Sequence, residues 1–260
     1  MQHRTEAPFA MAADRRRRIL EALAQDGRVV STELSRNFDV SEDTIRRDLR
    51  DMAAEGLLQR VHGGALPLAR PTPSFAARGR QAPEAKAALA RASVELVRPG
   101  QVVLIDGGTT NVAVARHLPL DLHATIATNS PDVAVALAEH RHIEVILLGG
   151  RVHRESQTVI DAATVSAVRQ IRADLCFLGI CSVDAAAGIT TPDLDEAHVK
   201  RAMVEASADV VALVTADKLG TASRYVVAPL SELTWLYTER SIYEHALAPY
   251  RAEGVSVTTV

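Results

Sequence analysis

The sequence of 260 residues is poor in aromatic side chains and cysteine, and it has no long apolar run. Aromatic residues make up 3% of the chain against 47% hydrophobic residues, so the core has to consist mostly of Ala, Val, Leu and Ile. Such a core suits tight packing of helices on a sheet better than an aromatic-rich sandwich. No apolar run approaches the roughly 20 residues that a membrane span needs, and residues 1–18 lack the apolar block of a signal peptide. We therefore expect a cytoplasmic protein.

The two cysteines, Cys176 and Cys181, lie in an apolar stretch with no second cysteine pair and no paired histidine. This context predicts buried thiols rather than a disulfide or a metal site. The sequence leads us to expect no metal and no cofactor.

The net charge gives no indication of nucleic-acid binding. It is −3 for the whole chain, and residues 1–70 carry 12 Arg, no Lys and 11 Asp or Glu, a balance of only +1. Any case for DNA binding therefore depends on where the charges lie.

Composition divides the chain in two. Residues 14–66 predict three short helices and a terminal hairpin, preceded by a flexible tail of residues 1–13. Residues 67–83 hold four prolines and few large apolar residues, which is typical of a linker. Residues 84–260 are expected to form a second, larger domain.

In the larger domain, short runs of Val, Ile and Leu alternate with helical patterns. The runs are continuous, as in strands that are buried on both faces. They span residues 102–105, 124–128, 144–148, 175–180 and 210–215. This repetition predicts an α/β fold with a mostly parallel sheet between layers of helices. Further strands are indicated at residues 224–228, 234–238 and 255–260.

The first domain has the element order of a helix-turn-helix. A helix is predicted from about Asp14 to Gln25, followed by a glycine at position 27. Ser31 is a suitable N-cap for a short second helix, and Ser41 for a third helix over residues 42–55. In this motif the last helix enters the major groove of DNA.

The predicted third helix has an apolar and a charged side. Ile45, Leu49 and Met52 share one narrow stripe that has to face the other helices. The opposite side carries one acidic and three basic residues: Asp43, Arg46, Arg47 and Arg50. Guanidinium groups in this position suit phosphates and guanine edges. The alternative is a solvated face on which the arginines pair with Asp43, Asp48 and Asp51.

Residues 56–65, GLLQRVHGGA, follow this helix. A helix stop at Gly56, a strand beginning at residues 57–58 and a tight turn at residues 63–64 predict a β-wing. Arg60 and His62 would then touch the DNA backbone beside the groove. The alternative is an ordinary loop.

Small and polar residues follow the predicted strands of the larger domain. They include DGGTT at residues 106–110, TNS at 128–130, two glycines at 149–150, DAAAG at 184–188 and Asp217-Lys218. A glycine loop at a helix start binds anions through backbone N–H groups, and ligands collect at the carboxyl ends of parallel strands. Each feature also has a simpler interpretation. DGGTT is compatible with a plain turn, Lys218 with a surface ion pair, and Glu196 with an ion pair to Lys200.

Taken together, the chain resembles the DeoR family of bacterial transcription regulators. The matching segments are RRRRIL (15–20), VSEDTIRRDLRDM (40–52), GLLQRVHGGA (56–65), DGGTT, TNS, LLGG, LDEAHVKRAM and TADKLG. The resemblance spans about residues 14–240 and implies a winged helix-turn-helix, operator binding and repression. It also implies a sensor domain similar in fold to ribose-5-phosphate isomerase, with sugar phosphates as effectors.

From the helix geometry and the resemblance we expect two sets of functional residues. The DNA-binding set is Ser41, Asp43, Thr44, Arg46, Arg47, Arg50, Arg60 and His62. The effector-binding set is Asp106, Gly107, Gly108, Thr109, Thr110, Asn129, Ser130, Asp184, Glu196 and Lys218. By the family likeness, residues 107–110 hold the phosphate, while Asp184, Glu196 and Lys218 face the sugar. Ser182 departs from the family, which usually has glycine there, and this affects how closely a ligand can approach.

We therefore expect a DNA-binding regulator, a repressor of sugar or carbohydrate metabolism genes under the control of a phosphorylated sugar-type effector. A reader of DNA half-sites is normally at least a dimer, so we expect a homo-oligomer, either dimer or tetramer. The main alternative is a sugar-phosphate isomerase fused to a DNA-binding domain, with Asp106, Asp184, Glu196 and Lys218 as acid–base groups. Another is an architectural DNA-binding protein whose sensor domain has lost its ligand.

Overall fold

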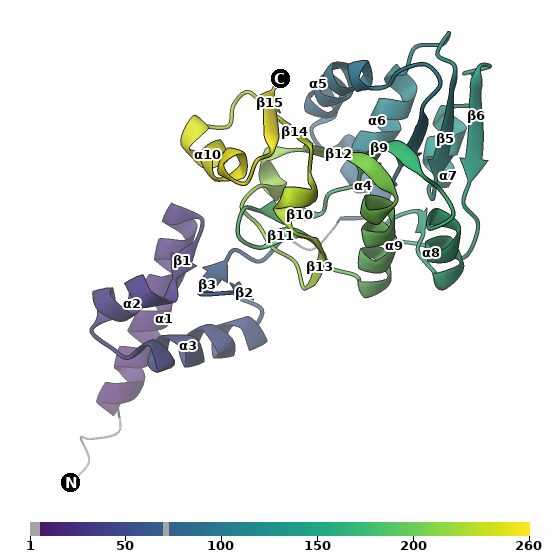
Figure 1. Ribbon diagram of the computed structural model, residues 1–260. Helices are drawn as coiled ribbons and strands as arrows, with labels where there is room; N and C mark the ends of the chain where they lie inside the picture. Colours follow the sequence, from purple (N-terminus) through teal and green to yellow (C-terminus); the bar gives the residue numbers. More distant parts are fainter. Residues whose placement is uncertain (1–5, 70–72) are drawn as a thin grey trace.

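The computed structural model describes residues 6–69 and 73–260, which form a small N-terminal unit and a larger α/β unit (Figure 1). The N-terminal unit packs three helices beside a small antiparallel sheet with strand order β1-β3-β2. Its elements are α1 (Glu6–Asp26), β1 (Val29–Val30), α2 (Ser31–Phe38), α3 (Glu42–Ala54), β2 (Gln59–Val61) and β3 (Gly64–Leu66). Together they make a helix-turn-helix with a two-stranded wing.

The apolar stripes predicted for the three helices form the core of this unit. Ile19 of α1, Leu34 of α2 and Ile45 of α3 are buried together with Leu58, which precedes the wing. Burying such side chains contributes roughly 1.5–3 kcal/mol each, which offsets the small size of the unit. This core therefore fixes the orientation of α3 relative to α1 and α2.

Two helix starts differ from the sequence predictions. Helix α1 begins at Glu6, so part of the expected tail over residues 1–13 is helical, while residues 1–5 lie outside the described residues. Ser31 is not an N-cap, because it is already the first residue of α2 and its backbone N–H donates to the carbonyl of Gly63 at 2.7 Å. Ser41 does cap α3, since its hydroxyl accepts from the backbone N–H of Thr44.

The segment expected to be a linker, residues 67–83, contains the short helix α4 (Phe75–Arg80) and the first residue of α5 (Pro83–Ser93). Ser74 caps α4 by accepting from the backbone N–H of Ala77, and Phe75 packs against the core of the larger unit. The backbone N–H of Ala69 donates to the carbonyl of Ala222 at 3.2 Å. The described part of the segment therefore lies against the α/β unit.

The larger unit is built on a seven-stranded sheet with strand order β15-β14-β12-β9-β4-β5-β6, in which every neighbouring pair is parallel. The strands are β4 (Val102–Ile105), β5 (Ala124–Thr128), β6 (Ile143–Leu147), β9 (Ala173–Leu178), β12 (Ser207–Val214), β14 (Trp235–Thr238) and β15 (Ser256–Thr259). All five strongly predicted runs are strands of this sheet, to within a few residues at their ends. The α/β fold class expected from the sequence is confirmed.

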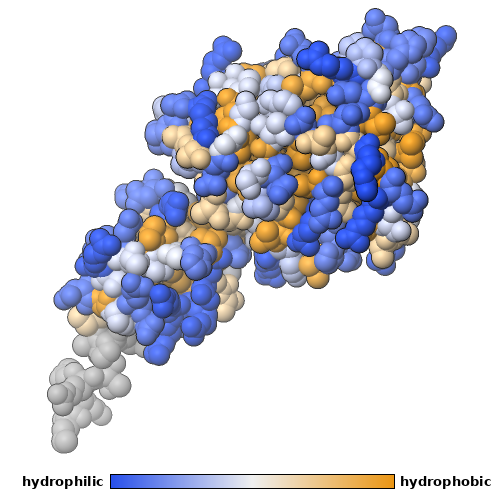
Figure 2. Space-filling view, viewed as in Figure 1, coloured by the Kyte–Doolittle hydropathy of each residue, from blue (hydrophilic) through white to orange (hydrophobic). Residues whose placement is uncertain are grey.

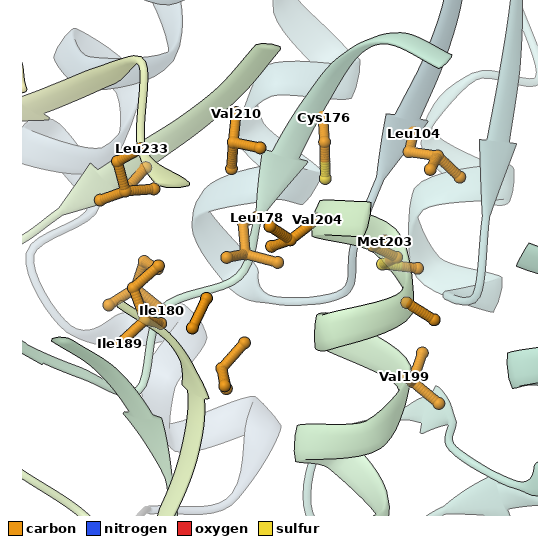
Figure 3. Packing of buried hydrophobic residues seen from close by; sticks show 14 of the residues in the cluster. Leu104, Cys176, Leu178, Ile180, Ile189, Val199, Met203, Val204, Val210 and Leu233 are labelled. Carbon is orange, nitrogen blue, oxygen red and sulfur yellow. The ribbon is translucent and has the colours of Figure 1, made fainter. Parts of the chain in front are cut away.

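Helices cover both faces of the sheet, as Figure 1 shows. They are α5, η1 (Val94–Leu96), α6 (Thr109–His117), α7 (Pro131–Ala136), α8 (Ala162–Val168), α9 (Leu194–Glu205) and α10 (Glu244–Ala252). One core contains side chains of α5, α6 and α7, and the other contains side chains of α8 and α9. In Figure 3, Met203 and Val204 of α9 lie beside Leu104, Cys176 and Leu178 of the central strands.

The strand order creates a switch point at the centre of the sheet. From β4 the chain continues to β5 and β6 on one side, and from β9 it continues to β12, β14 and β15 on the other. Strands β4 and β9 are neighbours, with Ile105 paired with Phe177 at their carboxyl ends. In open parallel sheets, ligands bind outside the carboxyl ends of the strands at such a point.

Two smaller sheets flank the main one. The first has the antiparallel order β10-β11-β13, and the second pairs β7 with β8. The remaining elements are β7 (Val152–His153), β8 (Thr158–Val159), β10 (Ser182–Asp184), β11 (Gly188–Thr191), η2 (Ala216–Lys218), β13 (Tyr225–Ala228) and η3 (Leu230–Glu232). Predicted strand 224–228 is therefore real but belongs to a small antiparallel sheet.

Candidate functional sites

Helix α3 exposes the charged side that its sequence predicts. Ile45, Leu49 and Met52 are at most 1% exposed, whereas the side chains of the opposite face are all exposed: Asp43, Arg46, Arg47 and Arg50. Ser41 and Thr44, at the start of the helix, are joined by a 2.9 Å contact between their hydroxyl oxygens. Hydrophilic side chains cover most of the visible face of the N-terminal unit in Figure 2.

The three arginines of this face differ in their surroundings. Arg46 lies 2.9 Å from a carboxylate oxygen of Glu42 and 3.5 Å from one of Asp43. Across the described residues, no carboxylate lies within ion-pair distance of Arg47 or Arg50. Pairing with acidic residues of the same helix therefore applies to Arg46 alone, and the exposed guanidinium groups of Arg47 and Arg50 remain available for an anionic partner.

Asp48 does not belong to the exposed face. It is 8% exposed, and its carboxylate accepts from the Arg15 Nε of α1 at 2.5 Å. The sequence interpretation that paired Asp48 with the arginines of its own helix is wrong. The ion pair instead joins α1 to α3.

The wing presents Arg60 and His62 to solvent. Its turn lies at residues 62–63, where Gly63 has a φ of 77°, a conformation that favours glycine. Gly64 already belongs to β3 and packs against the backbone of Val29, so no side chain fits there. The turn therefore lies one residue earlier than the predicted pair of glycines, because Gly64 pairs with β1 in the small sheet.

A cavity of about 420 Å³ lies at the carboxyl ends of β4, β9 and β12. Six residues of the expected effector set line it: Gly107, Gly108, Thr109, Thr110, Glu196 and Lys218. Helix α6 begins at Thr109, and its preceding residue, Gly108, has a φ of 133°. Since the first backbone N–H groups of a helix have no partner within it, this helix start offers donors to an anion in the cavity.

Four expected residues do not line the cavity: Asp106, Asn129, Ser130 and Asp184. Asp184 accepts from the backbone N–H groups of Ala186 and Ala187 at 2.8 and 2.9 Å and so closes the turn between β10 and β11. Its role in the structure is therefore that of a turn residue.

Asn129 and Ser130 support the glycine loop from behind. Asn129 accepts from the backbone N–H of Gly107 at 3.1 Å and donates to the carbonyl of Val159 at 3.2 Å. Ser130 is the N-cap of α7. These two buried residues shape the cavity wall without reaching the cavity.

Asp106 and Lys200 form a buried ion pair at the switch point. Asp106 also accepts from the backbone N–H of Gly179 at 2.9 Å, which ties the end of β4 to the end of β9. Burial opposes the charge of Lys200, but Asp106 and Glu196 outweigh burial and raise the lysine pKa. Glu196 lies 3.3 Å from Lys200, as the simpler sequence interpretation expected.

Burial likewise opposes ionisation of Glu196, but Lys200 and the hydroxyl of Thr191 outweigh it and lower the pKa of Glu196. The carboxylate is thus held ionised among fixed partners. Asp106 and Glu196 thus share the single buried cation of Lys200, and Glu196 and Lys200 form part of the cavity wall.

Sequence reasoning missed several residues of the cavity wall. They include Arg78, Gln81, Lys86, Asn111, Ser156, Thr158, Cys181 and Lys200. Arg78 lies in a segment whose composition indicated only a linker, and Lys86 lies within an ordinary helical pattern. Their position beside Lys218 comes from the tertiary fold, so the local sequence carried no signal for it.

The two cysteines are free in the structure. Cys176 is fully buried in the sheet, as predicted, whereas Cys181 is only half-buried and lines the cavity. Ser182, the residue that departs from the family pattern, is buried and bonded to Thr190 and Ser223 at 2.9 and 2.7 Å. Its hydroxyl is used in packing the small sheet and does not line the cavity.

Across residues 6–69 and 73–260, no helix is long and apolar enough to cross a membrane. A winged helix-turn-helix joined to an α/β unit is the architecture of a DNA-binding transcription regulator. Residues 15–69 match the DeoR-like helix-turn-helix domain, and residues 81–240 match the DeoR C-terminal sensor domain. The chain belongs to the DeoR family.

Curated relatives extend over most of the chain. It is 37% identical to the HTH-type transcriptional regulator GlpR of Haloferax volcanii, over 95% of this chain and 97% of the relative. It is 34% identical to the glycerol-3-phosphate regulon repressor of Escherichia coli K12, over 85% and 88% of the two chains. These relatives are named as transcriptional regulators and repressors, which is consistent with the DNA-binding regulator expected from the sequence.

Among solved structures, the chain is similar to ribose 5-phosphate isomerase A of Methanocaldococcus jannaschii. The TM-score is 0.38 and the identity is 16%, over 51% of this chain and 52% of the other.

Proposed function

We propose that the protein is a repressor of sugar or carbohydrate metabolism genes that binds operator DNA through α3 and the wing. The exposed arginines of α3 support this proposal, since guanidinium groups bind phosphates and the major-groove edge of guanine. The DNA-binding set is the one expected from the sequence: Ser41, Asp43, Thr44, Arg46, Arg47, Arg50, Arg60 and His62. Arg46 has to exchange its contact with Glu42 for one with DNA.

We further propose that a phosphorylated sugar-type molecule binds in the cavity and changes operator affinity. The observation that carries this proposal is the convergence of a glycine loop, a helix start and Lys218 on one cavity at the switch point. The relative named as a glycerol-3-phosphate regulon repressor supports a phosphorylated ligand class. The proposed ligand contacts are Gly107, Gly108, Thr109, Thr110, Glu196 and Lys218.

The protein is proposed to act as a homo-oligomer, either dimer or tetramer. One helix-turn-helix reads one half-site, and operators with two half-sites about one helical turn apart are matched by a two-fold symmetric protein.

The experiment is a titration of labelled operator DNA with the full chain, with and without a panel of phosphorylated sugars and their unphosphorylated counterparts. We expect a phosphorylated compound to shift operator affinity about 5–150-fold, the usual size of such coupling. If only unphosphorylated sugars shift the affinity, the proposed ligand class is wrong. An affinity that no compound of either kind changes would favour the architectural alternative.

A further inference from the structure

Three cations that line the cavity, Arg78, Lys86 and Lys218, are held by neutral partners. Arg78 donates to the carbonyl of Glu155 at 3.3 Å, and Lys86 donates to the carbonyl of Arg78 at 2.5 Å. Lys218 donates to the carbonyl of Ile180 at 2.7 Å. Within the described part of the chain, no carboxylate lies within ion-pair distance of any of the three, in contrast to Lys200.

The acidic residues of the cavity wall form no ion pair with these three cations. Glu196 is engaged by Lys200 and Thr191, and Glu239 accepts from the backbone N–H of Ala216 at 2.8 Å. Asp217, beside Lys218 in the sequence, is the remaining carboxylate of the cavity wall. All three carboxylates of the wall therefore lie beyond ion-pair distance of Arg78, Lys86 and Lys218.

Burial opposes the charged form of two of these cations. Lys86 is only 7% exposed, and burial together with the charge of Lys218 lowers the pKa of Lys86 to about 8. Burial also lowers the pKa of Lys218. Asp217 acts against this lowering at both lysines, and a bound anion would favour their charged forms further.

The three cations come from different parts of the chain. Lys86 lies on α5 and Lys218 on η2, whereas Arg78 lies on α4, in the segment between the wing and the α/β unit. The same segment contributes Ala69 and Pro73 to the cavity wall, and Ala69 lies three residues beyond the end of the wing strand β3. The segment that follows the wing in the chain thus contributes residues to the cavity wall.

We propose that Arg78, Lys86 and Lys218 together bind the dianionic phosphate group of the effector, and that this anion fastens the linker helix α4 to the α/β unit. The proposal rests on the proposed function for its ligand class and adds the residues that bind the negative charge of the phosphate. Three cations favour a dianionic phosphate monoester over a singly charged carboxylate. Because Arg78 belongs to the linker, occupancy of the cavity changes the restraint on the DNA-binding unit.

The test uses the full chain and two variants of α4, Arg78→Gln and Arg80→Gln. Arg80 is exposed on the same helix and does not line the cavity, so it is the matched control. Calorimetry with inorganic phosphate, glycerol 3-phosphate and glycerate measures affinity, and amide hydrogen exchange of residues 75–81 measures the restraint on α4. Thermal melting checks that each variant is folded.

We expect the wild type to bind glycerol 3-phosphate more tightly than glycerate, with slower exchange in α4 when phosphate is bound. Arg78→Gln should weaken phosphate binding about ten- to a hundredfold, the usual effect of losing a hydrogen bond to a charged group, and abolish the slower exchange. Arg80→Gln should do neither. If Arg78→Gln does not fold, Lys86→Gln takes its place with the same expected loss of affinity.

Phosphate binding by Arg78→Gln that equals the wild type would overturn the role of the linker and leave the proposed function intact. Absence of binding of both phosphate compounds to the wild type would overturn the proposed ligand class as well. Binding with unchanged exchange in α4 would refute the fastening of the linker.

Discussion

At the scale of single residues, the chain uses arginine in two different settings. Arg15 is paired with buried Asp48 and serves packing, whereas Arg47 and Arg50 project from α3 into solvent. An exposed guanidinium that has no ion pair costs little in the free protein and is fully available to DNA.

We expect Arg46→Ala and Arg47→Ala each to weaken operator binding while the protein stays folded. A lost guanine contact costs about 1–3 kcal/mol and relaxes specificity at one base, and a lost phosphate contact reduces the salt slope by about one. Arg47→Ala should have the larger effect, because Arg46 is already engaged by Glu42. Operator titrations at several salt concentrations measure both quantities.

The control is Arg17→Ala, which removes the same charge from an exposed position on α1. Wild-type affinity in both α3 variants, with the control unchanged, would place the DNA-reading surface elsewhere.

We expect Lys86 to make the proposed phosphate binding depend on pH. It faces Arg78 of α4 and both Asp217 and Lys218 of η2, and its pKa is lowered to about 8. Below that pH the free site carries the lysine charge, and above it the charge is lost, while a phosphate monoester is already dianionic above about pH 6. Affinity for glycerol 3-phosphate should therefore fall as the pH rises through about 8.

Calorimetric titrations between about pH 7 and pH 9.5 check this dependence, because that window lies below the titration of ordinary lysines. Lys86→Gln should bind more weakly at neutral pH and show a flatter profile. An affinity of the wild type that is constant or rising across the window contradicts the assignment.

At the scale of elements, the switch point is held by Asp106 of the β4 loop and Lys200 of α9. Lys200→Met leaves two buried carboxylates, Asp106 and Glu196, without their cation. Breaking a buried pair in this way costs about 3–5 kcal/mol. Urea denaturation of Lys200→Met should show a free energy of unfolding of the α/β unit that is lower by this amount.

Asp106→Asn combined with Lys200→Met should recover part of the stability, since it removes one of the uncompensated charges. If Lys200→Met alone is as stable as the wild type, the Asp106–Lys200 pair does not hold the ends of β4 and β9 together.

The sequence allowed the main sheet to be predicted because its strands are buried on both faces and appear as continuous apolar runs. Helix α4 was not predicted, because apart from Phe75 its residues are small or polar. Its stability comes from the packing of Phe75 on the α/β core. The glycine loop and Lys218 could be predicted as site residues because they follow predicted strands. Arg78 and Lys86 follow no predicted strand and were not predicted. Those two reach the cavity only through long-range packing.

At the scale of the whole molecule, the cavity and the DNA-binding unit share a segment of chain. A ligand changes operator affinity only if it binds two arrangements of the protein with different affinity. In the proposed mechanism, a ligand held by Arg78 would contact α4, so docking of α4 on the α/β unit would be the structural variable that the ligand biases.

The proposed coupling can be tested at the glycine loop and Lys218. Thr109→Ala combined with Lys218→Ala removes a hydroxyl at the start of α6 and a cation from the cavity. We expect the double variant to bind operator DNA like the unliganded wild type and to lose the response to phosphorylated ligands. The wild-type response should be about 1–3 kcal/mol, or 5–150-fold in operator affinity.

The matched control is Arg116→Ala, an exposed position on α6 that does not line the cavity. It should respond to ligand as the wild type does. Labelled operator is titrated with each protein, with and without a ligand that shifts the wild type. A double variant that still responds like the wild type would show that the glycine loop and Lys218 do not bind the ligand. Removing two donors to a buried dianion should lower its affinity too far for an unchanged response.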